Sequence, residues 1–135
     1  MRLMLDTNTC IALIKRKPLH ALQKFNEYQV GDIGVSAVTL AELRYGVFKS
    51  QHQAKNKEAL DEFMLPLEVA AFDEQATVVY GVLRAALEKQ GVPIGSLDTM
   101  IAAHALSLGV ALVTNNTREF NRVPELVVVD WISRD

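Results

Sequence analysis

Hydrophobic positions in this chain fall into two kinds of segment. Short, nearly uninterrupted apolar runs alternate with longer stretches in which apolar side chains recur at helical spacing. The short runs are typical of strands buried on both faces of a sheet, and the longer stretches predict helices. Strands are predicted at residues 2–5, 32–35, 67–72, 110–114 and 126–129. Helices are predicted at residues 7–17, 19–28, 37–50, 74–90 and 97–108, with a further helix near Phe63 that Pro66 ends.

Polar residues and glycines punctuate this pattern. Ser36, Asp73 and Ser96 each stand where a side-chain oxygen can cap the helix that follows, and Gly91 and Gly109 are typical helix stops. Because strands alternate with helices throughout, the predicted fold is α/β, with a central, mainly parallel sheet of about five strands covered on both faces. Ligands of such sheets bind beyond the carboxyl ends of the strands.

The length and apolar content indicate one domain over residues 1–135, since half of the residues are hydrophobic and can form a substantial core. The single cysteine, Cys10, permits no intramolecular disulfide and is predicted to fill the core. Residues 99–117 lack charged side chains, but polar residues such as His104 interrupt them, so they predict a buried helix and a strand instead of a membrane span. Asp6 comes too early for a signal peptide, and a cytoplasmic protein is expected.

The net charge of −2 argues against broad electrostatic attraction to nucleic acid. It does not exclude nucleic acid, because an acidic metal site would mask local basic patches such as residues 15–17, or Arg118 with Arg122. Residues 15–17 fit an ordinary solvated helix end equally well.

Acidic residues at the edges of apolar runs are the candidate chemistry. Asp6 ends the first strand, Glu42 and Asp98 lie in the opening turns of helices, and Glu119 follows the fourth strand. Carboxylates held close together repel one another unless a cation neutralises them, and oxygen ligands favour Mg²⁺ or Mn²⁺ over zinc. If the fold gathers these acids, they form a divalent-metal site that suits phosphodiester hydrolysis.

Short polar side chains flank the acids and are suited to orient them by hydrogen bonds. They are Thr7 and Asn8 beside Asp6, Ser36 and Thr39 before Glu42, and Thr114 and Asn116 before Glu119. Each acid also has a purely structural interpretation. Glu42 can be an exposed helical glutamate, Asp98 a partner of the helix dipole, and Asp6 a helix cap.

Two other acid-based chemistries do not fit the spacing. A phosphatase with an aspartyl nucleophile would want a second acid two residues after Asp6, and that position is Asn8. A phospho-receiver domain would want adjacent acids near the N-terminus and a lysine after a late strand, where Asn115 and Asn116 stand. His104, on an apolar helix, is interpreted as a core histidine.

The chain resembles the PIN-domain ribonucleases, and more narrowly the VapC toxins of bacterial toxin–antitoxin pairs. The resemblance rests on an ordered set of motifs at residues 4–8, 36–46, 98–105 and 112–120. It implies an α/β/α sandwich, Mg²⁺-dependent endoribonuclease activity with Mn²⁺ as a substitute, and neutralisation by a cognate VapB antitoxin. It also implies a homodimer that assembles further when the antitoxin binds.

Carried over by position, the resemblance implies that Asp6 and Asp98 are direct metal ligands. Glu42 would either bind metal or hold the attacking water. Asn116 stands where many PIN domains have aspartate, and Glu119 is the nearest remaining carboxylate, so the residue at the fourth position and the number of metals stay open.

The predicted function is therefore a toxin that cleaves RNA, with a transfer RNA anticodon loop as a candidate substrate. Tyr45, Phe48 and Tyr80 could stack on bases, but they are interpreted as packing aromatics. Two alternatives remain at this point. They are a protein-binding module of the same fold with weakened catalysis, favoured by Asn116, and a metal-dependent DNase.

Overall fold

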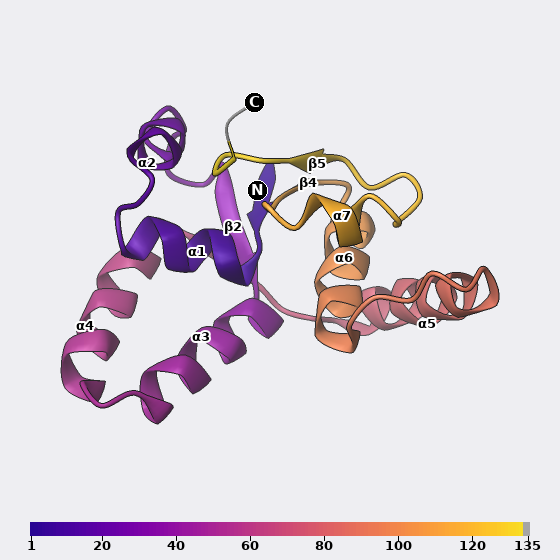
Figure 1. The fold of residues 1–135 in the computed structure, drawn as a ribbon, viewed down its shortest axis with the longest axis horizontal. Coiled ribbons are helices and arrows are strands. Elements are labelled where there is room, and N and C mark those ends of the chain that lie inside the picture. Colours follow the sequence, from indigo (N-terminus) through magenta and orange to yellow (C-terminus); the bar gives the residue numbers. More distant parts are fainter. Residues whose placement is uncertain (134–135) are drawn as a thin grey trace.

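A five-stranded parallel sheet runs through the middle of the computed structural model, which describes residues 1–133 (Figure 1). The strand order is β3-β2-β1-β4-β5, and every neighbouring pair is parallel. The chain leaves β1 toward β2 and later returns to its other side with β4, so the strand order reverses there. The strands are β1 (Leu3–Leu5), β2 (Ile33–Ser36), β3 (Glu68–Ala70), β4 (Ala111–Val113) and β5 (Val128–Val129).

Helices cover both faces of this sheet, with α1 to α4 on one side and α5 and α6 on the other (Figure 1). The α/β/α layering predicted from the sequence is confirmed. The helices are α1 (Thr7–Ile14), α2 (Leu19–Phe25), α3 (Ala37–Lys49), α4 (Gln53–Met64), α5 (Glu74–Lys89), α6 (Ser96–Leu108) and α7 (Thr117–Phe120).

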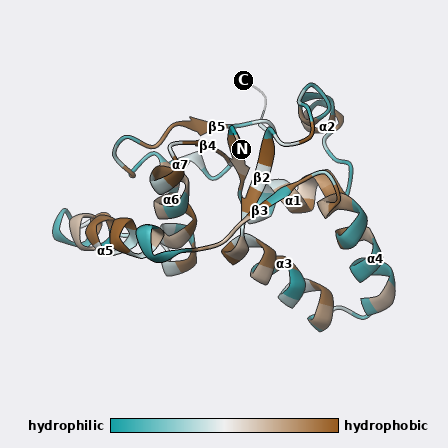
Figure 2. Ribbon diagram, turned by 180° about the vertical axis from the view of Figure 1, so that it is seen from behind, coloured by the Kyte–Doolittle hydropathy of each residue, from teal (hydrophilic) through white to brown (hydrophobic). Residues whose placement is uncertain are grey.

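The central strands are buried on both faces because their side chains alternate between two cores. Leu3 and Leu5 of β1 pack with α1 to α4, whereas Met4 packs with α5 and α6. Figure 2 shows the contrast in composition: β2 is brown, whereas much of the outer helix α4 is teal. The continuous apolar runs in the sequence follow from this double burial.

Most predicted caps are confirmed. The Ser36 side chain accepts a hydrogen bond from the backbone of Val38, and Asp73 accepts one from Ala76. Gly109 ends α6 in the left-handed conformation, with a φ of 67°. The predicted cap at Ser96 is wrong, because Gly95 is the N-cap residue and Ser96 is already helical.

Other expectations meet mixed outcomes. Cys10 is a free, buried thiol, as predicted. Tyr45 and Phe48 are not packing aromatics, since they are 67% and 60% exposed, whereas Tyr80 does pack against the second core. The short helix α7 had no signal in the hydrophobic pattern. Within residues 1–133, no helix is long and apolar enough to cross a membrane.

Gly34 provides a test of the central sheet. A Cβ at this position would lie 2.6 Å from the Glu68 carbonyl oxygen on β3, so we expect Gly34→Ala to lower the free energy of unfolding by about 1–3 kcal/mol. Gly81, in α5, has open space around it, since a Cβ there would meet nothing within 4 Å, so Gly81→Ala should raise that free energy by up to about 1 kcal/mol. Urea denaturation measures both, and a Gly34→Ala variant as stable as the wild type would contradict this packing.

Candidate active site

Asp6 lies at the carboxyl end of β1, where it caps α1, and its side chain is almost fully buried. Its Oδ1 accepts a hydrogen bond of 2.8 Å from the Thr9 backbone, and its Oδ2 accepts one of 2.5 Å from Thr114 Oγ1. Burial raises the pKa of Asp6, and the bonds from Thr114 and Thr9 oppose that rise. The structure therefore orients both carboxylate oxygens of Asp6 with neutral donors.

Glu42 lies on α3, across from the start of α1. Thr7 Oγ1 donates a hydrogen bond of 2.8 Å to Glu42 Oε1, so the residue after Asp6 also holds the second acid. This contact joins residues that are far apart in the sequence, and it fixes one oxygen of the Glu42 carboxylate.

Asp98 and Glu119 are two acids of the site that interact directly. Asp98 lies in the first turn of α6 and Glu119 in α7. Burial raises the pKa of Asp98 to about 7, assisted by its hydrogen bond to Glu119 and by the charges of Glu119, Glu42 and Asp6. The hydrogen bond from Asp98 lowers the pKa of Glu119. Glu119 is therefore the acid of this pair that ionises more readily.

Asn116 links Glu119 to Asp6 through hydrogen bonds. Its side-chain amide donates to Glu119 Oε2 at 2.7 Å, and its backbone N–H donates to Thr114 Oγ1 at 3.0 Å. Thr114 in turn donates to Asp6. The carboxylate beside Asp98 is thus Glu119, and Asn116 holds it in place.

The remaining predicted orienting residues lie elsewhere. Within the described part of the chain, Asn8, Ser36 and Thr39 make no hydrogen bond to these carboxylates. Ser36 Oγ lies 2.8 Å from Nδ1 of His104, which is buried as predicted. This contact ties α6 to the start of α3. Sequence spacing gave no sign of it, because the two residues come from different elements.

The donor set fits a hard divalent cation. All four groups are carboxylates, the oxygen ligands that such a cation prefers. Burial raises the pKa of Asp98, and the negative charges of the other three add to that rise. In residues 1–133, no three His, Cys, Asp or Glu side chains converge into a ready-made metal cage. The fit therefore rests on the oxygen donors and their charge, since a cation would relieve the repulsion among the carboxylates.

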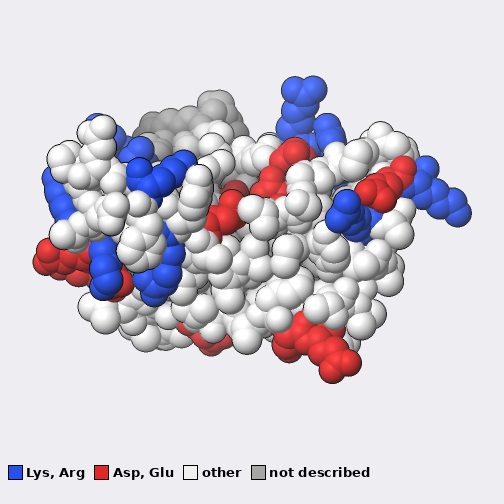
Figure 3. Space-filling view, turned by 90° about the horizontal axis from the view of Figure 1, so that it is seen from below, with Lys and Arg blue, Asp and Glu red and all other residues white. Residues whose placement is uncertain are grey.

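The surface around the acids has an uneven charge. Figure 3 shows acidic side chains near the middle of the face seen from below, and basic side chains gathered to their left, on the α3 and α4 side. A phosphate-bearing ligand approaching this face would meet cations beside the acidic centre.

Comparisons with known proteins show the family to which this chain belongs. The PIN domain model matches residues 3–126. The tRNA(fMet)-specific endonuclease VapC of Salmonella typhimurium is 44% identical over 131 residues, covering 97% of this chain and 98% of that protein. The enzyme of the same name from Shigella flexneri is 46% identical over 131 residues, with the same coverage. The crystal structure of DNA-bound VapBC from Salmonella typhimurium has a TM-score of 0.92 and 44% identity, covering 97% of this chain and 98% of that one.

The raised pKa of Asp98 predicts how stability depends on pH in metal-free buffer. Folded Asp98 keeps its proton up to about pH 7, whereas an unfolded aspartate loses it near 3.8. The folded state therefore binds more protons between these values, and the free energy of unfolding should fall as pH rises through this window. Asp98→Asn should reduce that fall, because it has no proton to lose.

Urea denaturation of both proteins in EDTA, at about pH 5.5 and about pH 8, measures this difference. Equal pH dependence in the wild type and Asp98→Asn would contradict the raised pKa of Asp98. Exposed Glu62 provides a control, since Glu62→Gln should keep the wild-type dependence.

Proposed function

We propose, because the chain belongs to the PIN-domain family and to its VapC branch, that it is the toxin of a VapBC-type toxin–antitoxin system and a metal-dependent endoribonuclease. The observation that carries this proposal is the gathering of Asp6, Glu42, Asp98 and Glu119 at the carboxyl edge of the sheet. Similarity to enzymes named as VapC endonucleases over nearly the whole chain supports it.

Asp6 and Asp98 are the residues that would hold Mg²⁺, or Mn²⁺ in its place, with Glu119 beside Asp98. The bound ion would supply a more acidic water and charge to balance the phosphate oxygens. Thr9 and Thr114 fix the Asp6 carboxylate for this task. Glu42 is held through Oε1 by Thr7, which leaves Oε2 to orient the attacking water and take its proton.

RNA is the proposed substrate, and a transfer RNA anticodon loop is the leading candidate within it. The two relatives above are named for cleavage of tRNA(fMet). Single-stranded loops expose both the backbone and the bases, so a loop can present one phosphodiester to the acids while neighbouring nucleotides bind around them.

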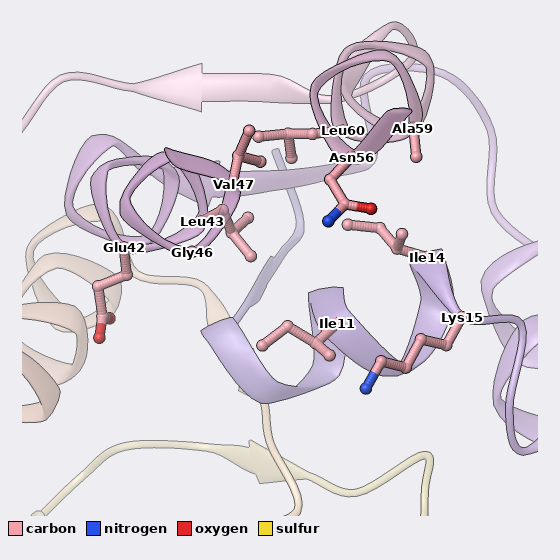
Figure 4. A pocket seen from close by; sticks show the side chains of 10 residues that line it. All are labelled: Ile11, Ile14, Lys15, Glu42, Leu43, Gly46, Val47, Asn56, Ala59 and Leu60. Atoms are coloured by element: carbon pink, nitrogen blue, oxygen red, sulfur yellow. The ribbon is translucent and has the colours of Figure 1, made fainter. Parts of the chain in front are cut away.

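A VapB-type antitoxin is the proposed protein partner, since the similar structure from Salmonella typhimurium is a VapBC complex. An apolar groove of about 300 Å³ lies between α1, α3 and α4 (Figure 4). Its walls include Ile14 of α1, Val47 of α3 and Ala59 of α4, with Glu42 at one end. An apolar antitoxin segment bound there could extend an arginine toward the acids, whose carboxylates pair well with a guanidinium.

A homodimer is proposed as well, with further assembly in the antitoxin complex. Val78 and Val82 lie one turn apart on α5 and are 59% and 69% exposed, which makes this helix face the candidate interface.

The alternative of a protein-binding module with weakened catalysis is less favoured. Glu119, beside Asp98, supplies the carboxylate that Asn116 lacks.

The nuclease proposal predicts that RNA cleavage needs both acids and a divalent ion. We expect Asp6→Asn and Asp98→Asn to lower kcat/KM by at least about 100-fold, since each removes charge from the centre that stabilises the reaction. EDTA should abolish cleavage by the wild type, and added Mg²⁺ or Mn²⁺ should restore it. Glu62→Gln, on exposed α4, should cleave like the wild type.

Gel analysis of a total RNA pool, followed by sequencing of the new ends, measures cleavage. Undiminished cleavage by both acid variants would contradict the assignment. Faster cleavage of DNA than of RNA at matched salt would select the DNase alternative.

The antitoxin groove predicts a variant that separates partner binding from catalysis. Ala59→Trp would place a large side chain in the groove, so we expect at least about tenfold weaker antitoxin binding. Ala54, exposed on the same helix outside the groove, provides the control Ala54→Trp. Isothermal titration with the antitoxin measures affinity, and RNA cleavage by both variants should stay at the wild-type level. Unchanged affinity of Ala59→Trp would place the antitoxin elsewhere.

A further inference from the structure

The solvent-facing side of α3 carries an aromatic residue that neither core uses. Tyr45 is 67% exposed and belongs to neither hydrophobic cluster. It follows Glu42 by nearly one helical turn, and Lys49 follows it by another, so all three side chains lie along one side of the helix. An aromatic ring left in water one turn from a catalytic carboxylate needs an explanation other than packing.

Tyr45 also lines a broad groove that opens from the acidic site. The groove has a volume of about 720 Å³ and lies between α1, α3 and α6. Thr7 and Glu42 lie on its wall, and these are the residues that meet in the 2.8 Å hydrogen bond of the active site. Leu97, on the opposite wall, precedes Asp98 directly in the chain. An occupant of the groove is therefore beside the acids.

The lining combines apolar walls with a cation. Leu97 and Met100 provide apolar surface, and Lys49 Nζ lies 5.0 Å from the centre of the Tyr45 ring. Lys49 makes no ion pair within residues 1–133, whereas nearby Arg44 and Lys57 both pair with Asp61. Lys49 therefore keeps its charge available to a ligand. An exposed aromatic ring beside an unpaired cation is the combination that binds single-stranded nucleic acid, through base stacking and phosphate contact.

We propose that Tyr45 and Lys49 form a nucleotide subsite next to the reacting phosphate, in which a base of the RNA stacks on the Tyr45 ring and Lys49 contacts a flanking phosphate. This inference rests on the proposed ribonuclease function and adds a residue-level determinant of substrate binding to it. Base stacking tolerates different sequences, so the subsite contributes affinity and position along the strand. A protein segment in the same groove is the competing occupant, and the experiment separates the two.

The first measurement is kcat/KM for a synthetic initiator transfer RNA anticodon stem-loop. Tyr45→Ala should lower it by about 5- to 100-fold, mainly through KM, because the stacked base loses its platform. Tyr45→Phe keeps the ring and should stay near the wild type. Phe48→Ala is the matched control, since Phe48 is 60% exposed on the same helix but does not line the groove, and it should leave cleavage unchanged.

The role of Lys49 is tested separately, through the salt dependence of KM. Lys49→Ala should weaken cleavage and also flatten the dependence of KM on salt concentration, because one phosphate contact is lost. Lys49→Arg keeps the charge and should retain the wild-type salt dependence.

The second measurement uses the same stem-loop with one base at a time removed to leave an abasic site. At one position near the cleaved bond, removal should cost the wild type as much as Tyr45→Ala does, and should cost Tyr45→Ala nothing further. Additive losses at every position would overturn the subsite. Equal losses in Tyr45→Ala and Phe48→Ala would overturn it as well.

The outcomes also separate this inference from the proposed function. Wild-type protein that cleaves no RNA with Mg²⁺ or Mn²⁺ present contradicts the ribonuclease function itself. Wild-type protein that cleaves while Tyr45→Ala cleaves equally well contradicts only the subsite. Intact cleavage by Tyr45→Ala together with weaker antitoxin binding would assign the groove to the protein partner instead.

Discussion

Repulsion among four carboxylates is the constraint on which the candidate active site depends. Asp6, Glu42, Asp98 and Glu119 come from different parts of the chain, and burial, together with its hydrogen bond to Glu119 and the charges of the other three acids, raises the pKa of Asp98 to about 7. A rigid structural support is needed to hold such groups together. The buried strands β1 and β4 provide one, because Met4, Leu5, Leu112 and Val113 are fully buried between the two helical layers.

Neutral groups donate the hydrogen bonds that orient three of these acids. Threonine hydroxyls hold Asp6 and Glu42, and the amide of Asn116 holds Glu119. The nearby Arg122 donates to the Pro93 carbonyl, and its charge contributes to the lowered pKa of Glu119. A lysine or arginine paired with these acids would remove the repulsion, but it would also use the charge that a metal ion needs. Without such a pair the folded state is less stable, but the site stays negatively charged.

The sequence predicted the layered fold well, because the fold depends on local signals. Continuous apolar runs identified the central strands, and Asp6 at the end of one of them pointed to the site. The bond between Thr7 and Glu42 and the contact between His104 and Ser36 depend on tertiary packing, which leaves no periodic pattern. The prediction that Tyr45 is a packing aromatic is wrong for the same reason, since its side chain is exposed. An aromatic residue in an amphipathic helix fits a core position as well as a solvent-facing one, and only the packed structure distinguishes them.

An acidic centre also determines where the binding energy for RNA can come from. A polyanion gains nothing electrostatically from approaching four carboxylates, so its affinity must come from groups placed around them. The low net charge of the chain is therefore a poor guide to its ligand, since acids at the centre offset cations at the side. Aromatic stacking avoids this conflict because it carries no net charge, and a ring on α3 can bind a base while Glu42, on the same helix, faces the phosphate. The aromatic ring then supplies binding affinity, and the carboxylate on the same helix supplies the chemistry. This division explains how a chain of net charge −2 can act on RNA.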